Sequence, residues 1–267
     1  MLRLDAGPAS LATKTRTEIA DVATQSGSVL VVPVGSIEQH GHHLPVATDT
    51  LLADAIAERG AERVSDEQPT LVAPPVWTGY SPHHLSLGGT LTTDADRLVG
   101  LLEDVADSAA ELGFDAVLLV NGHGGNGPVV DLAVSTIGEE HPDLEVTGVT
   151  YFELAEPFAD EIRDSDTGGM AHGGEFETSL LLHLYPDLVR EDETEGTYLD
   201  EPYDRGGQDL LEGGPVNSYT EFEEYSESGA IGDPDLASAE KGEELFDRLG
   251  DELADVLRTV HEQATET

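Results

Sequence analysis

The stretch Gly35–Thr50, with the sequence GSIEQHGHHLPVATDT, lies between two segments whose patterns predict regular structure. It follows the apolar run Leu30–Val34, LVVPV, which is typical of a buried β-strand. It precedes apolar residues at helical spacing that begin near Thr50. We therefore expect it to connect the carboxyl end of a strand to a helix, which is where open α/β sheets keep their binding sites.

This connection is rich in side chains that bind metal ions. It contains Glu38, His40, His42, His43 and Asp49, and such a mixture of oxygen and imidazole ligands suits Zn²⁺, Mn²⁺ or Fe²⁺. Glu38 and His40 are two positions apart, so an extended backbone points both side chains the same way. Asp49 is expected at the start of the helix, where a carboxylate is favoured and can bridge two cations. The alternative is a capped loop whose histidines face solvent, and the position at a strand end favours the metal site.

Strands and helices alternate along the chain and predict the fold class. The expected strands are Ser28–Val34, Thr70–Ala73, Ala116–Val120 and Leu144–Tyr151. The expected helices are Thr15–Ala23, Leu51–Val64, a segment from Thr93 to about Leu112, Pro128–Glu139, Glu175–Leu184 and Asp235–Glu262. Such alternation produces an α/β fold with a mostly parallel sheet and helices on both faces.

The chain shows no internal repeat, linker or second-domain boundary, so we expect residues 1–267 to form a single domain. Residues 1–27 read as a polar lead-in. Residues 190–230 are polar, glycine-rich and irregular, and we interpret them as an excursion that serves as a lid or a subunit contact.

The net charge is -43, from 55 acidic and 12 basic residues. This balance argues against a nucleic-acid-binding surface and against binding to anionic membranes. Regular apolar segments argue against disorder, so we interpret the charge as an acidic, solvated surface suited to a salt-rich cytoplasm, as in a halophile. No cysteine is present, which excludes disulfides and thiolate ligands. No signal-peptide core or long apolar run is found, and we expect a cytoplasmic location.

Two further motifs carry candidate ligands. NGHGGN at Asn121–Asn126 directly follows a predicted buried strand, which puts His123 at the same sheet edge. Its glycines allow close approach to a ligand, although a phosphate-binding loop lacks support without the lysine and glycine spacing of the known motifs. HGGEFETS follows later and holds Glu175 and Glu177, which point about 200° apart on a helix. Only one of these two carboxylates can readily face the site.

The three segments supply enough ligands for two cations about 3.5–4 Å apart with a shared water. Such a pair lowers the pKa of water and polarises a carbonyl, as amide hydrolysis requires. Serine and cysteine nucleophiles find no support, since neither a GxSxG elbow nor a cysteine is present.

These motifs together resemble the creatininase (creatinine amidohydrolase) family. The first motif, GSIEQHGHHLPVATD, the second, NGHGGN, and the third, HGGEFETS, occur in the family order and at family-like separations. Similarity extends from about Ser28 to Leu184 and resumes weakly at Gly229–Gly242. The resemblance implies a three-layer α/β/α sandwich with a mostly parallel central sheet, a homohexamer and a two-metal centre that hydrolyses amide C–N bonds. The acidic composition indicates a haloarchaeal-type member.

Carried over position by position, the resemblance implies that Glu38, Asp49 and His123 bind one metal. His40 and Asp49 bind the other, with Asp49 as the bridge. The two cations are expected to be Zn, Mn or Fe, and the substrate a small-molecule amide.

The resemblance also implies catalytic roles. His172 matches the substrate-contacting histidine, and Glu177 matches the acidic residue that closes the site. Creatininase proper carries NGHYEN, whose glutamate binds the second metal, whereas Gly125 holds that place here. We therefore predict that Glu177 replaces the missing ligand, with Glu175 as the fallback.

Substrate contacts are predicted on weaker grounds. Gly124 and Gly125 offer backbone N–H groups to a developing oxyanion. Ser81 and His84 lie in a long loop expected to border the site. Creatininase proper clamps its flat substrate with a Trp-Asp pair, but Gly168–Gly169 stands at the matching positions, so creatinine is not the expected substrate.

Other functions stay open at this level. Similar branches of the family remove a formyl group from a pyrimidine nucleotide on the riboflavin and deazaflavin route, or trim a peptide-derived redox cofactor. A function of another class is a non-catalytic metal-binding scaffold or regulatory module. A binder of a phosphorylated ligand is a third, weaker option.

Overall fold

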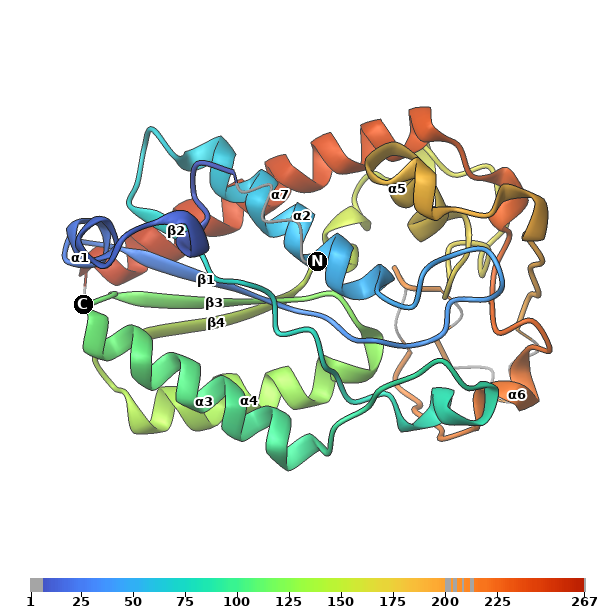
Figure 1. Cartoon of the computed structure of the whole chain (residues 1–267), viewed down its shortest axis with the longest axis horizontal. Helices are drawn as coiled ribbons and strands as arrows, with labels where there is room; N and C mark the ends of the chain where they lie inside the picture. The colour runs from blue at the N-terminus through green and yellow to red at the C-terminus, as the bar shows by residue number, and fades with distance from the viewer. Residues whose placement is uncertain (1–6, 200–202, 204–205, 208, 212–213, 267) are drawn as a thin grey trace.

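The protein is described by a computed structural model that covers residues 7–199, 203, 206–207, 209–211 and 214–266. Four parallel strands form one sheet in the order β2-β1-β3-β4 (Figure 1). The strands are β1 Val29–Val34, β2 Thr70–Val72, β3 Ala116–Asn121 and β4 Glu145–Thr150. Each coincides with a predicted strand to within two residues.

The register between the two central strands positions the site. Val29 of β1 pairs with Ala116 of β3, and the pairing continues to Val34 and Asn121. The two strands therefore end at the same level. Because parallel strands point the same way, the segments that follow them leave the sheet side by side at its carboxyl edge.

Helices cover both faces of the sheet, which confirms the predicted α/β layering. The helices are α1 Arg16–Ala23, α2 Thr48–Val64, α3 Ala95–Leu112, α4 Gly127–Glu140, α5 Glu175–Leu184, α6 Phe222–Tyr225 and α7 Ala239–Glu266. In Figure 1, α2 and α7 lie on one side of the strands and α3 and α4 on the other.

Strand β1 shows why its sequence is apolar throughout. Val29 and Val31 belong to the core shared with α2 and α7, whereas Leu30 and Val32 belong to the core shared with α3 and α4. All six residues of the strand are buried. A strand buried on both faces has no solvent side on which polar residues could alternate.

Two segments differ in detail from the prediction. The last helix begins at Ala239 rather than Asp235, because Pro234–Leu236 forms a separate 3₁₀ turn. No strand or helix is predicted for residues 152–170 and only short 3₁₀ turns occur there, yet Phe158 and Met170 are buried in the larger core. Their acidic neighbours in the sequence conceal this contribution.

Part of the 190–230 excursion is described. Its helix α6 packs against the 3₁₀ turn Pro82–Leu87, and Gly206 forms an isolated parallel bridge with Val216. The first six residues of the lead-in and several residues of the excursion lie outside the described part of the chain. Within the described residues, no helix combines the length and the apolar character needed to cross a membrane.

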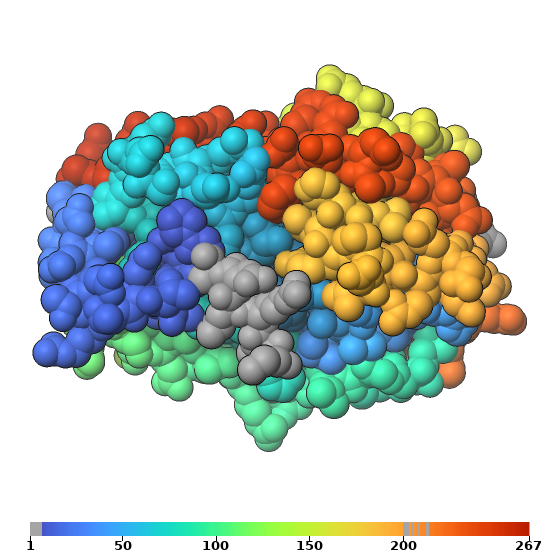
Figure 2. All heavy atoms as spheres, turned by 45° about the horizontal axis from the view of Figure 1, so that its top comes forward, coloured from blue at the N-terminus to red at the C-terminus, as the bar shows by residue number. Residues whose placement is uncertain are grey.

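Helices α5 and α7 approach closely at one glycine. A Cβ on Gly242 would lie 1.9 Å from the backbone oxygen of Ser179, which belongs to α5. The backbone N–H of Ser238 also donates to the Ser179 hydroxyl at 3.2 Å. The space-filling view shows α7, in red, against the gold surface around α5 (Figure 2). This contact holds the middle of α5 against the start of α7.

We expect the substitution Gly242→Ala to lower stability by about 1–3 kcal/mol, because the added methyl group forces the two helices apart. The matched control is Gly100→Ala in α3, where an added Cβ meets nothing within 4 Å. That change should raise stability by about 0.5–1 kcal/mol through helix propensity. Urea unfolding of both variants measures the difference, and equal effects of the two substitutions would contradict the close packing.

Candidate metal centre

Five acidic and histidine side chains converge at the carboxyl edge of the sheet. They come from the loop after β1, the start of α2, the loop after β3 and the start of α5, and they are Glu38, His40, Asp49, His123 and Glu177. None is more than 4% exposed. The three sequence motifs are therefore brought together in space.

One group of three surrounds a first candidate cation position. His123 Nδ1 lies 3.1 Å from Glu38 Oε2 and 3.4 Å from Asp49 Oδ2. The ligand atoms of these three residues lie within 4.8 Å of one another. Two carboxylate oxygens and one imidazole nitrogen form a donor set that suits a divalent transition metal.

A second group of three lies next to the first and shares Asp49. His40 Nε2 is 2.9 Å from Asp49 Oδ1 and 3.6 Å from Glu177 Oε1. Asp49 thus turns one oxygen toward each group. This is the arrangement expected of a carboxylate that bridges two cations.

The two candidate ligand histidines are oriented by backbone carbonyls. His40 donates from Nδ1 to the Glu38 carbonyl at 3.1 Å, which leaves Nε2 facing Asp49. His123 donates from Nε2 to the Tyr80 carbonyl at 3.2 Å, with the Ser81 hydroxyl at 3.0 Å, which leaves Nδ1 facing Glu38. Metal-binding histidines characteristically hold their second nitrogen in this way.

Several polar atoms in the cluster are buried without a hydrogen bond. They are Glu38 Oε1, Glu38 Oε2, His40 Nε2 and Asp49 Oδ2. A buried polar atom without a partner costs about 1–3 kcal/mol, and more if it carries charge. Cations held between these atoms would satisfy all of them, so the donor set fits two divalent metal ions.

The electrostatics lead to the same conclusion. Burial, together with repulsion from Glu38, raises the pKa of Asp49 to about 7. Burial opposes a charge on His123, but Glu38 outweighs it and raises the pKa of His123 to about 9. Likewise, the carboxylates of Asp49 and Glu177 outweigh burial and hold the pKa of His40 well above its usual value. The carboxylates thus attract positive charge strongly, which either protons or metal ions can supply.

The two glutamates of HGGEFETS have different surroundings. Glu177 Oε2 accepts a hydrogen bond from the Gly173 N–H at 2.6 Å, and its other oxygen faces His40. Glu175 points elsewhere, where it accepts the N–H groups of Asp164 and Ser165 and pairs with Lys241. The structure therefore brings Glu177, and not the fallback Glu175, to the candidate ligands.

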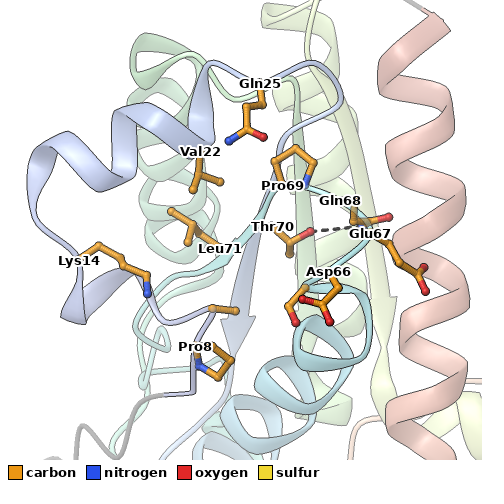
Figure 3. Close-up of a pocket in the computed structure, with 12 residues that line it drawn as sticks. Pro8, Lys14, Val22, Gln25, Asp66, Glu67, Gln68, Pro69, Thr70 and Leu71 are labelled. Carbon is orange, nitrogen blue, oxygen red and sulfur yellow. Dashed lines mark hydrogen bonds between the residues drawn. The ribbon is translucent and has the colours of Figure 1, made fainter.

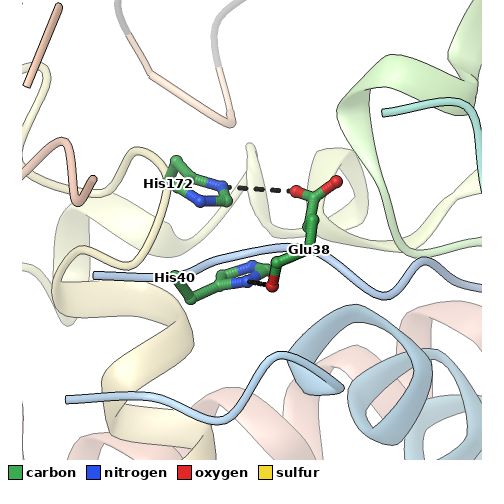
Figure 4. Close-up of side chains that lie close together, drawn as sticks. All are labelled: Glu38, His40 and His172. Atoms are coloured by element: carbon green, nitrogen blue, oxygen red, sulfur yellow. Dashed lines mark hydrogen bonds and ion pairs between the residues drawn. The ribbon is translucent and has the colours of Figure 1, made fainter. Parts of the chain in front are cut away.

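His172 lies above the cluster. It donates from Nε2 to the Gln39 carbonyl at 2.6 Å, and its Nδ1 is 3.6 Å from Glu38 Oε1 (Figure 4). With Glu38 and His40 it forms a third group close enough to share an ion. Burial, with repulsion from His40, lowers the pKa of His172 to about 3, so the ring is neutral at physiological pH.

The remaining predicted residues surround the ligands. Ser81 is fully buried, and its hydroxyl lies 2.6 Å from that of Ser36 and 3.0 Å from His123 Nε2. His84 Nε2 lies 3.3 Å from Glu38 Oε1. Ser81 thus contacts the candidate ligand His123 and His84 contacts the candidate ligand Glu38, and the contact of both residues with substrate stays a prediction.

Gly124 and Gly125 begin a 3₁₀ turn directly after His123. A Cβ on Gly125 would lie 2.4 Å from His123 Nε2 and 2.7 Å from the Tyr80 carbonyl. No side chain fits there in this conformation, so this loop offers no counterpart to the carboxylate of the NGHYEN pattern.

Three further residues of the site were not anticipated from the sequence. Gln39 is buried between His84 and His172. The Phe222 ring of α6 lies 4.1 Å from the His84 ring and 4.8 Å from the His172 ring, measured between centroids. The Tyr151 hydroxyl is buried without a partner. Of these three residues, only Gln39 had a signal in the sequence, because it stands between the candidate ligands Glu38 and His40. Alternation along an extended chain predicts that its side chain points away from theirs, toward other neighbours.

A separate hollow of about 510 Å³ lies near the start of β2, at the amino-terminal side of the sheet (Figure 3). Its lining includes Lys14, Asp66, Glu67 and Thr70. Among the residues that the structure describes, every group of acidic and histidine side chains close enough to share a metal ion lies instead at the opposite edge. The chemistry of the chain is concentrated there.

We expect Glu177→Gln to reduce the metal content of the purified protein from two ions per chain to one, because the second group loses a charged ligand. Glu175→Gln should retain both ions and instead lower the melting temperature, since its pairing with Lys241 is weakened. Elemental analysis by mass spectrometry together with thermal unfolding distinguishes the two. Loss of metal from the Glu175 variant alone would show that the assignment is reversed.

Comparisons with known proteins identify the family to which this chain belongs. A family model described as creatinine amidohydrolase matches residues 12–257. The mycofactocin precursor peptide peptidase of Mycolicibacterium smegmatis is 33% identical over 94% of this chain and 91% of its own length. The creatinine amidohydrolase of Pseudomonas putida is 32% identical over 86% and 88%.

Solved structures agree with these relatives. A manganese form of creatininase superposes with a TM-score of 0.81 at 28% identity, over 94% of this chain and 98% of that one. A zinc–zinc form of a creatininase variant gives 0.81 at 28% identity, over 95% and 98%. The three-layer α/β/α fold and the resemblance inferred from the motifs are confirmed, and the chain belongs to the creatininase family of amidohydrolases.

Proposed function

We propose that this protein hydrolyses an amide C–N bond with the help of two divalent cations, which are zinc, manganese or iron. The observation that carries the proposal is that the two carboxylate oxygens of Asp49 face two adjacent groups of candidate ligand atoms, one oxygen toward each group. Family membership supports hydrolysis, and the manganese and zinc forms of solved relatives support metal dependence.

Each cation has a distinct set of residues to hold it. Glu38, Asp49 and His123 would hold one cation, and His40, Asp49 and Glu177 the other. When bound, such a pair supplies a water of lowered pKa and polarises the scissile carbonyl.

Residues next to the candidate ligands would transfer protons and stabilise the developing negative charge. His172 is neutral and tied at Nε2, so its Nδ1 is free to accept a proton from the attacking water and pass it to the leaving nitrogen. The N–H groups of Gly124 and Gly125, next to His123, would stabilise the oxyanion. Because the site is buried and its dielectric constant is low, the electrostatic interactions of His172 and of these N–H groups with the substrate would be stronger than in water.

The substrate that we propose is a peptide-like amide rather than creatinine. Gly168 has a φ of +96°, and a Cβ on Gly169 would lie 2.2 Å from the Cβ of Ser165. This backbone has no room for a Trp-Asp pair at positions 168 and 169, which is the pair that creatininase proper uses to hold creatinine. The relative named as a peptide peptidase, which aligns along almost the whole chain, supports a peptide-like substrate.

We expect the purified protein to cleave one class in a panel of creatinine, N-formyl amines and short peptides, and to lose activity after chelation. Asp49→Ala should lower both metal content and activity, the latter by more than about 100-fold, because even residues behind the ligands contribute about 10–100-fold. The measurements are turnover by mass spectrometry and metal content by elemental analysis.

Full activity after exhaustive chelation would contradict the two-metal mechanism. Cleavage of creatinine alone would contradict the substrate class, and cleavage of formyl amines alone would favour a deformylase. One metal per chain with no turnover on any amide would favour a metal-binding module.

We also propose that the protein works in a salt-rich cytoplasm, as a homo-oligomer of the kind implied by the family resemblance. The support is the charge of -43, which surface pairs such as Arg63–Asp251 and Arg258–Glu67, each at 2.9 Å, offset only in part. At molar salt the Debye length is about 3 Å, which screens the remaining repulsion.

We therefore expect the melting temperature to fall when salt is lowered from molar to millimolar concentration. Calorimetry in potassium chloride and in potassium glutamate separates screening from an effect specific to one anion. A melting temperature that is insensitive to desalting would contradict the halophilic assignment.

A further inference from the structure

We propose that Gln39 is a positioning residue of the candidate metal centre, which sets the proton positions on His84 and His172. Its side chain would place the His84 proton on the nitrogen that faces Glu38, and its backbone would leave the other nitrogen of His172, Nδ1, without a proton. The inference about catalysis rests on the proposed function, but the proton positions themselves do not.

The orientation of the Gln39 carboxamide is fixed by a backbone donor. The Gly41 N–H donates to Gln39 Oε1 at 3.0 Å, so the other end of the amide is the NH₂ group. Gly41 has a φ of +68°, a conformation that favours glycine and turns this N–H back onto the side chain. The amide therefore points its donor away from Gly41.

That donor meets His84. Gln39 Nε2 lies 2.8 Å from His84 Nδ1, and an amide NH₂ group can only donate. His84 Nδ1 must accept, so the proton of the neutral ring sits on Nε2. This nitrogen faces Glu38 Oε1 at 3.3 Å, a contact that does not have the geometry of a hydrogen bond, and Glu38 Oε2 is directed toward His123.

The backbone of the same residue orients the second histidine. The Gln39 carbonyl accepts the His172 Nε2–H at 2.6 Å, so Nδ1 keeps its lone pair. One residue between two candidate ligands thus orients the N–H of one imidazole toward a candidate ligand and leaves the other imidazole as an acceptor.

The end of the 190–230 excursion holds this arrangement in place. A Cβ on Gly229 would lie 1.9 Å from Gln39 Oε1, so only glycine allows the chain to pass so close. Gly229 has a φ of +89°, and its N–H donates to the Ser226 hydroxyl at 3.1 Å. The Phe222 ring stacks on His84 from the same segment, with ring planes 25° apart. Both ends of the Gln39–His84 hydrogen bond are therefore covered.

A purely structural role for a buried amide is the competing explanation, and Gln68 provides a matched control. Gln68 is also buried, and its Nε2 donates to the Leu257 carbonyl at 3.1 Å and to the Thr70 hydroxyl at 3.3 Å, near the start of β2. The substitutions Gln39→Met and Gln68→Met remove an amide of the same size at each place.

We expect Gln39→Met to weaken Zn²⁺ binding by about 10–100-fold, which is the usual effect of losing a residue that orients a ligand. Gln68→Met should leave Zn²⁺ affinity unchanged even if it lowers the melting temperature. The affinity is measured by competition with a chromogenic chelator. In the background of His84→Phe, which keeps the stacking on Phe222, Gln39→Met should add little, because its effect passes through His84.

Nitrogen NMR of the imidazole rings, in zinc-loaded and in metal-free protein, provides a readout independent of activity. His84 is expected as the Nε2–H tautomer in the wild-type protein and as a mixture in the Gln39→Met variant. The inference is overturned if His84 is the Nδ1–H tautomer in the wild-type protein. It is also overturned if Gln39→Met and His84→Phe have additive effects on Zn²⁺ affinity, or if Gln68→Met lowers that affinity as much as Gln39→Met does. The tautomer is measurable whether or not any amide is cleaved, so this test fails separately from the proposed function.

Discussion

Three carboxylates buried within a few ångströms of one another dominate the energetics of this molecule. Glu38, Asp49 and Glu177 are almost fully removed from solvent, and mutual repulsion in such surroundings is severe unless positive charge lies between them. Protonated histidines are one source of that charge and divalent cations are another. Because the oxygens of Glu38 lack hydrogen bonds, metal ions satisfy the cluster more completely than protons do. The fold must therefore hold together a site that opposes folding when it is empty.

The parallel sheet makes this possible. β1 and β3 pair in register to their last residues, so Gly35 and Gly122 leave the sheet next to each other. The candidate ligands Glu38 and His123, which follow them closely, therefore meet without long loops. Each ligand is then supported from behind by backbone, as the carbonyl of Glu38 supports His40 and that of Tyr80 supports His123. Such support comes from rigid elements, and it keeps the side chains in a geometry that their repulsion would otherwise disperse.

Much of this arrangement could be predicted from the sequence, and the exceptions share a physical cause. Apolar runs such as Val29–Val34 predict buried strands, and ligands that directly follow such runs must reach the same edge. The choice between Glu175 and Glu177 could not be made locally, because it depends on Lys241, which lies 66 positions beyond Glu175 in the chain. The stacking of Phe222 on the site was equally inaccessible, since the surrounding composition predicts only irregular, solvated chain.

The origin of the last carboxylate has a consequence for how the site is assembled. Since Gly125 leaves no room for a side chain, the loop after β3 offers only its histidine as a candidate ligand, and the start of α5 offers Glu177. His172 lies five positions before Glu177 on the same segment, so a candidate ligand and the candidate proton carrier move together. Glu175 lies at the same helix start, and its pairing with Lys241 joins α5 to α7. The two carboxylates of this helix start therefore have different roles, since Glu175 attaches α5 to α7 while Glu177 faces the candidate ligands.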